Sequence, residues 1–282
     1  MLLISVFCLS CTSPTSEDSE AETCNEQVEI CDRSIAQVLF AGTHNSMSSE
    51  QEGWLGPNHI YPIPKQLTDG IRALNIDTYW WEEEPYMCHG YCELGAQPLQ
   101  YATDSIAQFL SEHPQNVLII TFQSTLTAEQ TLEPFIASGL ATELYTHTTG
   151  TEWPTLSTFI ENQTRLLLFS NTDGGRIPGY MSQWEHWLDN PYSAQSVADF
   201  SCLPDRGETT TASLYNMNHF LTNPIAQPSL AEEANAKQTI EEHLNRCIAE
   251  TGLHPTQILV DFYSIGSVLE VVRSYNENIS LD

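Results

Sequence analysis

Basic residues are scarce in this chain. Nine Lys and Arg stand against 37 Asp and Glu, so the formal net charge is -28 over 282 residues. Such a charge repels a phosphate backbone, and no basic stripe offsets it, which excludes a nucleic-acid-binding protein. The same charge argues against electrostatic attraction to anionic membrane surfaces. A bound cation, in contrast, is favoured by an acidic field.

Several motifs of common enzyme classes are missing as well. No Gly-x-Gly-x-x-Gly follows the first apolar segment, which removes the main support for a dinucleotide-binding fold. The sequence contains no Gly-x-Ser-x-Gly, so serine hydrolases with a nucleophile elbow are disfavoured. It also contains no His-Glu-x-x-His, the zinc motif of many metalloproteases.

The N-terminal segment predicts export. Residues 1–11 are apolar and end in Cys-Leu-Ser-Cys, the form of a short secretion signal. We expect either a lipoprotein site, with Cys11 lipidated at a membrane surface, or an ordinary signal peptide, because no Lys or Arg precedes the apolar run. The run is far shorter than the roughly 20 residues of a membrane-spanning helix. We therefore expect a leader and acidic tether over 1–23 and one domain over 24–282, secreted or held at the cell envelope, and monomeric.

Six cysteines remain outside the leader. An even number in an exported chain predicts disulfides, and six cysteines allow fifteen pairings. Local spacing favours Cys24–Cys31, Cys88–Cys92 and Cys202–Cys247. A zinc site is the less favoured alternative, because no two closely spaced Cys-x-x-Cys pairs occur.

Short apolar segments alternate with segments of helical periodicity along the whole length. Continuous apolar runs such as 117–122 are typical of strands buried on both faces. The alternation predicts an α/β fold with a mostly parallel sheet, and at this length a TIM-like (β/α)8 barrel, with an open doubly wound sheet as the alternative. The expected strands are 38–41, 71–79, 86–89, 117–122, 165–169, 213–218 and 258–263. One short helix is expected to end at 70, and the other expected helices span 99–113, 128–138, 154–162, 231–250 and 268–276.

Three ionisable side chains lie at or near the ends of predicted strands. His44 follows the first strand, His89 follows the third, and Asp261 lies in the last. Active sites of barrels lie at the carboxyl ends of their strands, so we expect these side chains to share a pocket. Two histidines can act as a general base and a general acid. A buried carboxylate can hold one imidazole in the required tautomer.

Three further side chains, Asn45, Asp77 and Gln123, could supply hard oxygen ligands beside the histidines. Their positions after or within predicted strands place them at the same end of the expected barrel. The residues alone leave open whether such a cation site is present.

A series of short motifs makes the chain resemble the X-domain family of phosphatidylinositol-specific phospholipases C, and most closely its secreted, disulfide-bearing PLC-like phosphodiesterases. The resemblance covers roughly residues 24–275 and implies a distorted TIM barrel that cleaves a phosphodiester. The matching pieces are Cys-x6-Cys-Asp-Arg at 24–33, Gly-Thr-His-Asn-Ser at 42–46, Gln-Leu at 66–67, Asp-Gly-Ile-Arg at 69–72, Asp-Thr-Tyr at 77–79, Cys-His-Gly at 88–90, Phe-Leu at 109–110, His-Pro at 113–114, Trp-Pro-Thr at 153–155 and Val-Asp-Phe-Tyr at 260–263.

The resemblance implies a role for each residue of the constellation. His44 corresponds to the general base that takes the proton from the inositol 2-hydroxyl, whose oxygen then attacks phosphorus and gives a cyclic phosphate. His89 corresponds to the general acid for the leaving diacylglycerol oxygen, and Asp261 to the carboxylate that orients the first histidine. Arg72 matches a further family position. We expect a structural ion-pair partner there in preference to a substrate-binding residue.

The resemblance also implies a cation. Metal-independent bacterial members have an Arg where this chain has Asp77, whereas calcium-dependent members have an Asp there and an Asn beside the first histidine. Asp77 and Asn45 therefore imply a Ca²⁺ site. Calcium-dependent members add carboxylates where this chain has Asn75 and Gln123, so we expect Ca²⁺ to bind weakly.

The substrate remains open at this point. The chain has no basic inositol-phosphate cluster, so the substrate need not be a phosphoinositide. Another phospholipid, a glycerophosphodiester or a lipid-linked glycan is also a candidate. One alternative is a Mg²⁺-dependent enzyme of the sphingomyelinase D or glycerophosphodiesterase type, for which Asn75 and Asp77 supply half of the usual Glu-x-Asp pair. Another is a non-catalytic surface lipoprotein that binds a lipid or glycan headgroup.

Overall fold

The computed structural model describes residues 23–279. The predicted leader, most of the acidic tether and the predicted lipidation at Cys11 lie outside the described residues. Among residues 23–279, no helix has the length and apolar character needed to cross a membrane.

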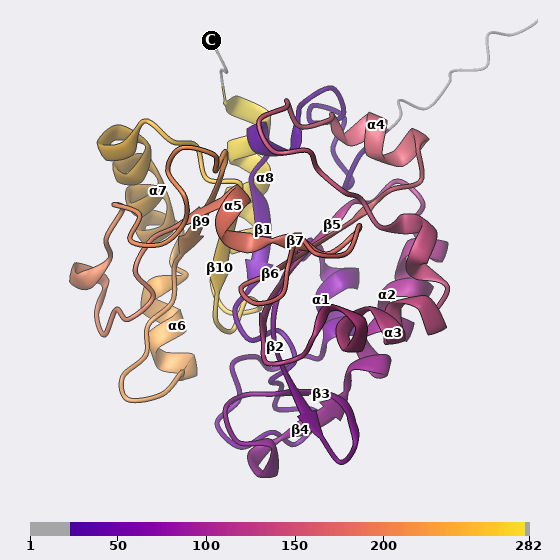
Figure 1. The fold of residues 1–282 in the computed structure, drawn as a ribbon. Helices are drawn as coiled ribbons and strands as arrows, with labels where there is room; N and C mark the ends of the chain where they lie inside the picture. The colour runs from indigo at the N-terminus through magenta and orange to yellow at the C-terminus, as the bar shows by residue number, and fades with distance from the viewer. Residues whose placement is uncertain (1–22, 280–282) are drawn as a thin grey trace, which may run out of the picture.

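Eight parallel strands form the frame of the domain (Figure 1). Each of these strands pairs in parallel with the next one of the set along the chain, and the last strand, β10, pairs with the first, β1. The exception is β7 and β8, which no ladder joins within residues 23–279. The sheet therefore curls into a distorted barrel that is open at one seam. A doubly wound sheet reverses its strand order partway, and this sheet does not, so the barrel prediction is confirmed. The strands are β1 Phe40–Thr43, β2 Ala73–Trp81, β5 Leu118–Ser124, β6 Leu166–Ser170, β7 Met181–Ser182, β8 Trp187–Asp189, β9 Leu214–Asn218 and β10 Gln257–Val260.

A two-stranded extension lies outside this frame. β3 (Glu84–Cys88) pairs antiparallel with the far end of β2, and β4 (Ala96–Pro98) pairs antiparallel with β3. The predicted strand before His89 is thus present, but it belongs to a hairpin that extends the barrel at one end and not to the barrel wall. Figure 1 shows this hairpin at the bottom of the molecule.

The helices cover the outside of the barrel. α1, α2 and α3 lie side by side on one flank, while α7 and α8 pack together on another (Figure 1). In α2 the apolar residues Ile106, Phe109 and Leu110 are buried, as the helical spacing predicts. The helices are α1 Ile63–Asp69, α2 Leu99–Glu112, α3 Ala128–Ala137, α4 Leu156–Glu161, α5 Gln183–His186, α6 Pro228–Ala234, α7 Lys237–Thr251 and α8 Val268–Asn278, with 3₁₀ turns η1 Ile35–Gln37, η2 Cys92–Leu94, η3 Leu140–Glu143 and η4 Val197–Asp199.

The single helix predicted over 231–250 is wrong, because the chain breaks between α6 and α7 at Asn235. The Asn235 side chain donates a hydrogen bond to the carbonyl of Asp261 at 2.8 Å, and its own carbonyl accepts from the backbone N–H of Ser267. These bonds to the segment after β10 replace the continuation of α6. The break in the helix therefore places Asn235 where it can bind the backbone that follows β10.

All three predicted disulfides are present, Cys24–Cys31, Cys88–Cys92 and Cys202–Cys247. The two cysteines of the second disulfide flank His89, so this bond closes the short loop that carries the histidine. The third joins positions 45 residues apart in the sequence, so it removes the most conformational freedom from the unfolded chain.

Candidate active site

Two neighbouring strands bring His44 and Asp261 together. The register of β1 and β10 places Thr43 opposite Val260, so the next residue of each strand lies at the same edge of the sheet. The backbone N–H of His44 continues this ladder by donating to the carbonyl of Val260. The side chains meet across the two strands, and His44 Nδ1 lies 3.0 Å from Asp261 Oδ1. Strand register alone thus creates the pair.

The chain turns sharply after each of these two residues. Asn45, which follows His44, has φ 49°, and Phe262, which follows Asp261, has φ 45°. Side chains other than glycine rarely adopt this left-handed conformation, and each instance costs about 1–3 kcal/mol. Such backbone strain clusters at functional sites, and here it fixes how both side chains project from the sheet.

Further groups hold the Asp261 carboxylate. It is 4% exposed, and Asn58 Nδ2 donates to its Oδ1 at 2.9 Å. The carbonyl of Asn58 in turn accepts from the backbone N–H of Phe262 at 2.7 Å. Asn58 lies in the loop before α1, where no strand or helix pattern marks it, and sequence reasoning missed it.

The imidazole of His44 is held on its face as well as at its edge. The ring of Phe220 stacks on it with centroids 3.8 Å apart and planes 4° from parallel. His59 donates from Nε2 to the carbonyl of His44 at 2.7 Å. Burial lowers the pKa of His59 to about 4, so this ring stays neutral. Phe220, the second residue after β9, was also missed.

The amide of Asn45 bridges the two candidate histidines. Its Nδ2 donates to His44 Nε2 at 3.1 Å and to His89 Nε2 at 3.2 Å. Because His44 donates from Nδ1 to Asp261, its Nε2 carries a lone pair that can accept a proton. His89 is an exposed residue whose ring is partly desolvated in the site, which lowers its pKa, as does the neighbouring His44.

The predicted oxygen ligands lie beside the histidines. Asp77 and Gln123 are partners in the register of β2 and β5, and both line the same cleft as His44 and His89. Burial raises the pKa of Asp77 to about 6, while the charge of His44 acts in the opposite direction. Asn75 lies deeper, where its Nδ2 points to Thr121 at 3.4 Å.

The donor set fits a hard cation that is held weakly. Carboxylate and amide oxygens are the ligands that Ca²⁺ prefers, and its affinity rises with the number of charged ligands. Asp77 supplies one carboxylate, and Asn45 could add an amide oxygen. A cation there would offset the cost of burying the ionised Asp77 carboxyl.

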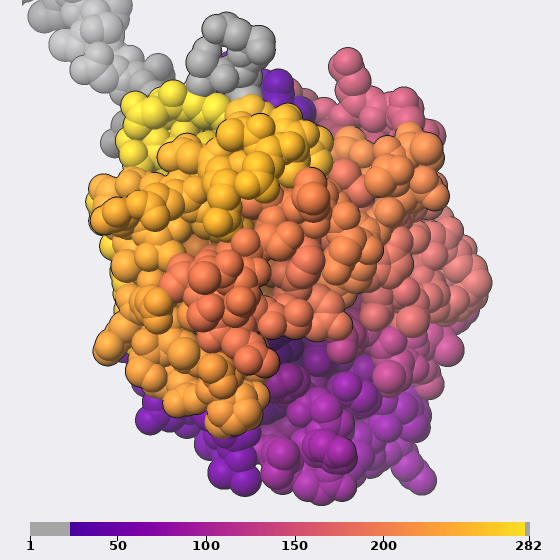
Figure 2. Space-filling model, turned by 90° about the vertical axis from the view of Figure 1, so that its left-hand side faces the viewer, coloured from indigo at the N-terminus to yellow at the C-terminus, as the bar shows by residue number. Residues whose placement is uncertain are grey.

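The histidines open into a cleft of ≈ 690 Å³. In Figure 2 a hollow lies between the orange C-terminal segments and the purple region of the hairpin, with indigo atoms at its base. Large apolar side chains at its rim are open to solvent: Leu55 is 69% exposed, Ile225 54%, Tyr192 53% and Leu94 44%. The cleft thus has a polar floor and an apolar mouth.

A smaller polar cavity adjoins the floor, inside the barrel and next to His44. Its wall holds the buried Asp189 carboxylate, which pairs with Arg206 and accepts from Asn216 at 2.7 Å and Asn218 at 2.6 Å. The Arg206 guanidinium lies over the Tyr192 ring at 4.3 Å. Sequence reasoning did not find this cluster, because its members come from β8, β9 and an irregular loop.

The structure places Arg72 away from the cleft, so its predicted substrate-binding role is wrong. Its guanidinium is buried and forms two hydrogen bonds to the carboxylate of Glu26, at 2.7 and 2.8 Å. It also donates to Asn116 and to the carbonyl of Leu67, both at 2.6 Å. Arg72 is therefore a structural ion-pair partner, which was the favoured expectation for this position.

Comparison with known families decides the relationship of this chain. The PI-PLC X 1 family model matches residues 30–276. The chain belongs to the PI-PLC X family. The matched range contains every residue of the candidate site, from His44 to Asp261.

Relatives of this PI-PLC X chain occur in fungi and plants. A PI-PLC X domain-containing protein 1 of Arthroderma benhamiae is 27% identical over 93% of this chain and 91% of its own length. A secreted protein of the same fungus is 26% identical, over 91% of this chain and 64% of its own length. A PI-PLC X domain-containing protein of Arabidopsis thaliana is 25% identical over 83% of this chain and 60% of its own length.

Solved structures agree on the fold. The phosphatidylinositol-specific phospholipase C of Listeria monocytogenes superimposes with a TM-score of 0.62 at 17% identity, over 89% of this chain and 96% of that one. A variant of the Staphylococcus aureus enzyme gives 0.59 at 14% identity, over 89% and 95%. This PI-PLC X chain therefore has the distorted TIM-barrel fold of those enzymes.

Proposed function

We propose that this protein is a phosphodiesterase of the phospholipase C type. The observation that carries the proposal is the pair of imidazoles, His44 and His89, on one cleft, with the first held by the buried carboxylate of Asp261. Of two imidazoles placed on either side of a phosphodiester, one can take the proton of the attacking hydroxyl and the other can give a proton to the leaving oxygen.

We infer the two roles from the hydrogen bonds and charges of the histidines. His44 donates from Nδ1 to Asp261, so its Nε2 takes the proton of an attacking headgroup hydroxyl. That oxygen forms a bond to phosphorus while the bond from phosphorus to the lipid oxygen breaks. Protonated His89 delivers a proton to the leaving oxygen, and the products are a cyclic phosphate and an alcohol. The lowered pKa of His89 makes its protonated form a stronger acid for this step.

The shape of the cleft supports a lipid substrate with an uncharged polar headgroup. Apolar side chains at the mouth, such as Leu55 and Ile225, suit acyl chains or a lipid surface. The lining of the adjoining cavity is rich in amides, and Arg206, the one Lys or Arg that residues 23–279 contribute to it, is neutralised by Asp189. A headgroup with additional phosphates would find no other cation from residues 23–279 there. Phosphatidylinositol, the substrate in the names of the solved neighbours, has this character.

We also propose export. The three disulfides fit an oxidising compartment, and one fungal relative is named as a secreted protein. Lipidation at Cys11 and a membrane surface as partner are part of this proposal.

A substrate panel tests the proposed function. Phosphatidylcholine vesicles carrying phosphatidylinositol, phosphatidylinositol bisphosphate or sphingomyelin would be incubated with the protein, with Ca²⁺, Mg²⁺ or chelator. We expect diacylglycerol from phosphatidylinositol and much less from the bisphosphate. Ceramide phosphate formed with Mg²⁺ would favour the sphingomyelinase D alternative. A folded protein that cleaves none of these would contradict the proposal.

We propose further that Asp77 and Asn45 hold a Ca²⁺ ion. The ion would stabilise negative charge on the phosphoryl oxygens. With one carboxylate we expect half-maximal activation at about 10⁻⁴–10⁻³ M Ca²⁺. Because Asp77 must be ionised to bind the ion and its pKa is about 6, the Ca²⁺ requirement should rise as pH falls through that value. Activity at varied Ca²⁺ and pH measures this.

The matched variants for this prediction are Asp77→Asn, which should remove the response to Ca²⁺, and Asp104→Asn on the outer face of α2, which should keep it. An unchanged Ca²⁺ response in Asp77→Asn would exclude this site.

Phe220 gives a prediction on positioning. Its ring fixes the plane of the His44 imidazole, so Phe220→Ala should lower kcat by roughly 10–100-fold, as small misplacements of a reacting group do. Phe220→Tyr keeps the stacked ring and should retain most of the activity. Steady-state kinetics on short-chain phosphatidylinositol compare the variants, and equal kcat in Phe220→Ala and the unmodified protein would show that stacking is irrelevant.

A further inference from the structure

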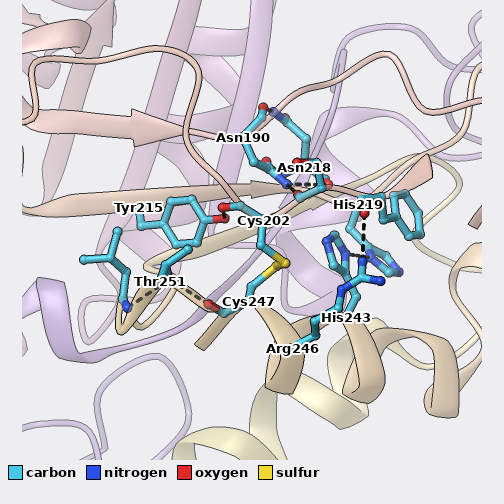
Figure 3. The surroundings of a disulfide bond; sticks show 12 residues. Asn190, Cys202, Tyr215, Asn218, His219, His243, Arg246, Cys247 and Thr251 are labelled. Carbon is cyan, nitrogen blue, oxygen red and sulfur yellow. Dashed lines mark hydrogen bonds between the residues drawn. A yellow bond between two sulfur atoms is a disulfide. The ribbon is translucent and has the colours of Figure 1, made fainter. Parts of the chain in front are cut away.

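A buried cluster of sulfur and nitrogen atoms lies apart from the catalytic histidines. The Cys202–Cys247 disulfide joins the segment after β8 to α7, and the paired imidazoles of His219 and His243 lie beside it (Figure 3). His243 and Cys247 are four residues apart on α7, so their side chains share one face of that helix. Cys202 reaches this face of α7 from the segment that follows β8.

The three side chains have the arrangement of metal ligands. One ligand atom each of Cys202, His243 and Cys247 all lie within 4.8 Å of one another, and all three residues are buried. Zn²⁺ prefers Cys sulfur and His nitrogen in a tetrahedral set, with bonds of about 2.0–2.3 Å. Small side-chain movements would bring these atoms onto a common ion once the sulfurs are no longer bonded to each other.

Hydrogen bonding leaves one nitrogen of this cluster without a partner. His219 donates from Nε2 to the carbonyl of Ala234 at 2.8 Å, so in its neutral form its Nδ1 is an acceptor. The two Nδ1 atoms are 2.7 Å apart, which makes His243 Nδ1–H the donor. His243 Nε2 then carries a lone pair, and among residues 23–279 this buried atom has no hydrogen-bond partner.

The imidazole of His219 orients the ring of His243. Its Nδ1 accepts from His243 Nδ1–H, so the other nitrogen of His243, Nε2, is the one available to a metal ion. A histidine that binds a metal usually donates its second ring N–H to a hydrogen-bond acceptor in this way.

An ion can reach the cluster from the surface. A cavity of ≈ 220 Å³ is lined by Phe200, Thr239, His243 and Arg246, among others. Phe200 stacks on the His243 ring with centroids 4.6 Å apart. The cavity therefore ends at the imidazole that carries the unpartnered nitrogen.

We propose that Cys202, His243 and Cys247 form a Zn²⁺ site when the Cys202–Cys247 disulfide is reduced, with the fourth position open to water from the cavity beside His243. A dithiol reductant supplies two electrons and two protons, so the S–S bond breaks, two thiols form and the reductant becomes a disulfide. Zn²⁺ then displaces the two thiol protons to solvent and forms two Zn–S bonds. The charge of the ion is balanced by the two thiolates.

The two states are alternative cross-links at one place in the fold. The disulfide joins α7 to the segment after β8 in an oxidising compartment, and the Zn²⁺ ion joins them under reducing conditions. The site is independent of the proposed catalytic function, because none of its three ligand residues lines the cleft that contains His44 and His89.

Cobalt and zinc binding test the proposal. The full chain would be treated with a dithiol, freed of reductant under anaerobic conditions and titrated with Co²⁺. We expect a thiolate-to-cobalt charge-transfer absorption that saturates at one ion per chain, is displaced by Zn²⁺ and is absent from the oxidised protein. Absence of this absorption from the reduced, folded protein would overturn the proposal.

Variants locate the site. The double variant Cys202→Ser/Cys247→Ser should lose the absorption, and Cys88→Ser/Cys92→Ser, which removes the pair beside His89, should retain it. His243→Gln should weaken Co²⁺ binding by more than roughly tenfold, whereas His254→Gln, beyond the C-terminal end of α7, should leave it unchanged. Retention of the full signal in Cys202→Ser/Cys247→Ser or His243→Gln would contradict the assignment.

A second measurement reports on each cysteine of the reduced, folded protein separately. The protein would be reduced with Zn²⁺ or with chelator present, alkylated with iodoacetamide and mapped by mass spectrometry. We expect Zn²⁺ to protect Cys202 and Cys247 at least about tenfold relative to chelator, and His243→Gln to lose this protection. Equal alkylation of both cysteines with and without Zn²⁺ would refute the site.

Discussion

His44→Ala should lower kcat on phosphatidylinositol by about 10³-fold or more, with little change in KM. General bases contribute typically 10²–10⁴-fold, and His44 also holds the carboxylate of Asp261 in place through the 3.0 Å contact. Asp261→Asn should give a loss of similar size, because the neutral amide cannot stabilise the imidazolium that forms during attack.

The two losses should not add. Residues that act as one unit show strongly non-additive effects, so the double variant His44→Ala/Asp261→Asn should be nearly as active as His44→Ala alone. The control is His254→Ala, whose ring bonds to Tyr275 on α8 and should leave kcat unchanged. Full additivity, or wild-type kcat in His44→Ala, would exclude His44 as the base.

His89→Ala should lower kcat by about 10²–10⁴-fold on natural substrates, and a good leaving group should restore most of the loss. A general acid matters only when the leaving oxygen needs a proton, and an aryl alcohol such as nitrophenol leaves without one. Inositol phosphate esters of a lipid alcohol and of nitrophenol would be compared as substrates of the same variant.

The comparison separates the two histidines. Rescue by the nitrophenyl ester is expected in His89→Ala and is not expected in His44→Ala, because the attacking hydroxyl still needs a base. Equal rescue in both variants, or no rescue in His89→Ala, would mean that the two roles are not divided in this way.

The barrel and the pair of His44 and Asp261 could be predicted because both depend on short-range patterns. Apolar runs end at glycine or polar residues, and the residue after each parallel strand has to lie at the same edge of the sheet. His44 and Asp261 meet for this reason. The predicted last strand extended to 263, whereas β10 ends at Val260, so Asp261 lies just beyond the strand and not within it.

Other parts of the site depend on contacts that no local pattern contains. Asn58 comes from an irregular loop, and its bond to Asp261 joins residues 203 positions apart. The polar cluster of Asp189 and Arg206 depends on the course of an irregular segment between β8 and β9. The seam of the barrel was also beyond prediction, because β7 has two residues and α5 has four, too few for either periodicity to appear.

Arg72 illustrates the limit of reasoning from a motif. It lies in the matched Asp-Gly-Ile-Arg segment, and a cation in a phosphodiesterase invites a role with phosphate. Its location is instead set by Glu26 near the first disulfide and by the carbonyls at the end of α1. Only the three-dimensional position distinguishes a substrate-binding Arg from a structural one.

The central claim is that His44 and His89 cleave a lipid phosphodiester through attack by the headgroup itself. Phosphorus NMR of phosphatidylinositol vesicles treated with the protein tests it most directly. We expect a cyclic inositol phosphate resonance to appear as the lipid phosphodiester signal falls, and both changes to disappear in His44→Ala. An unchanged lipid signal, or release of an open phosphate monoester with no cyclic species at any time, would contradict the account.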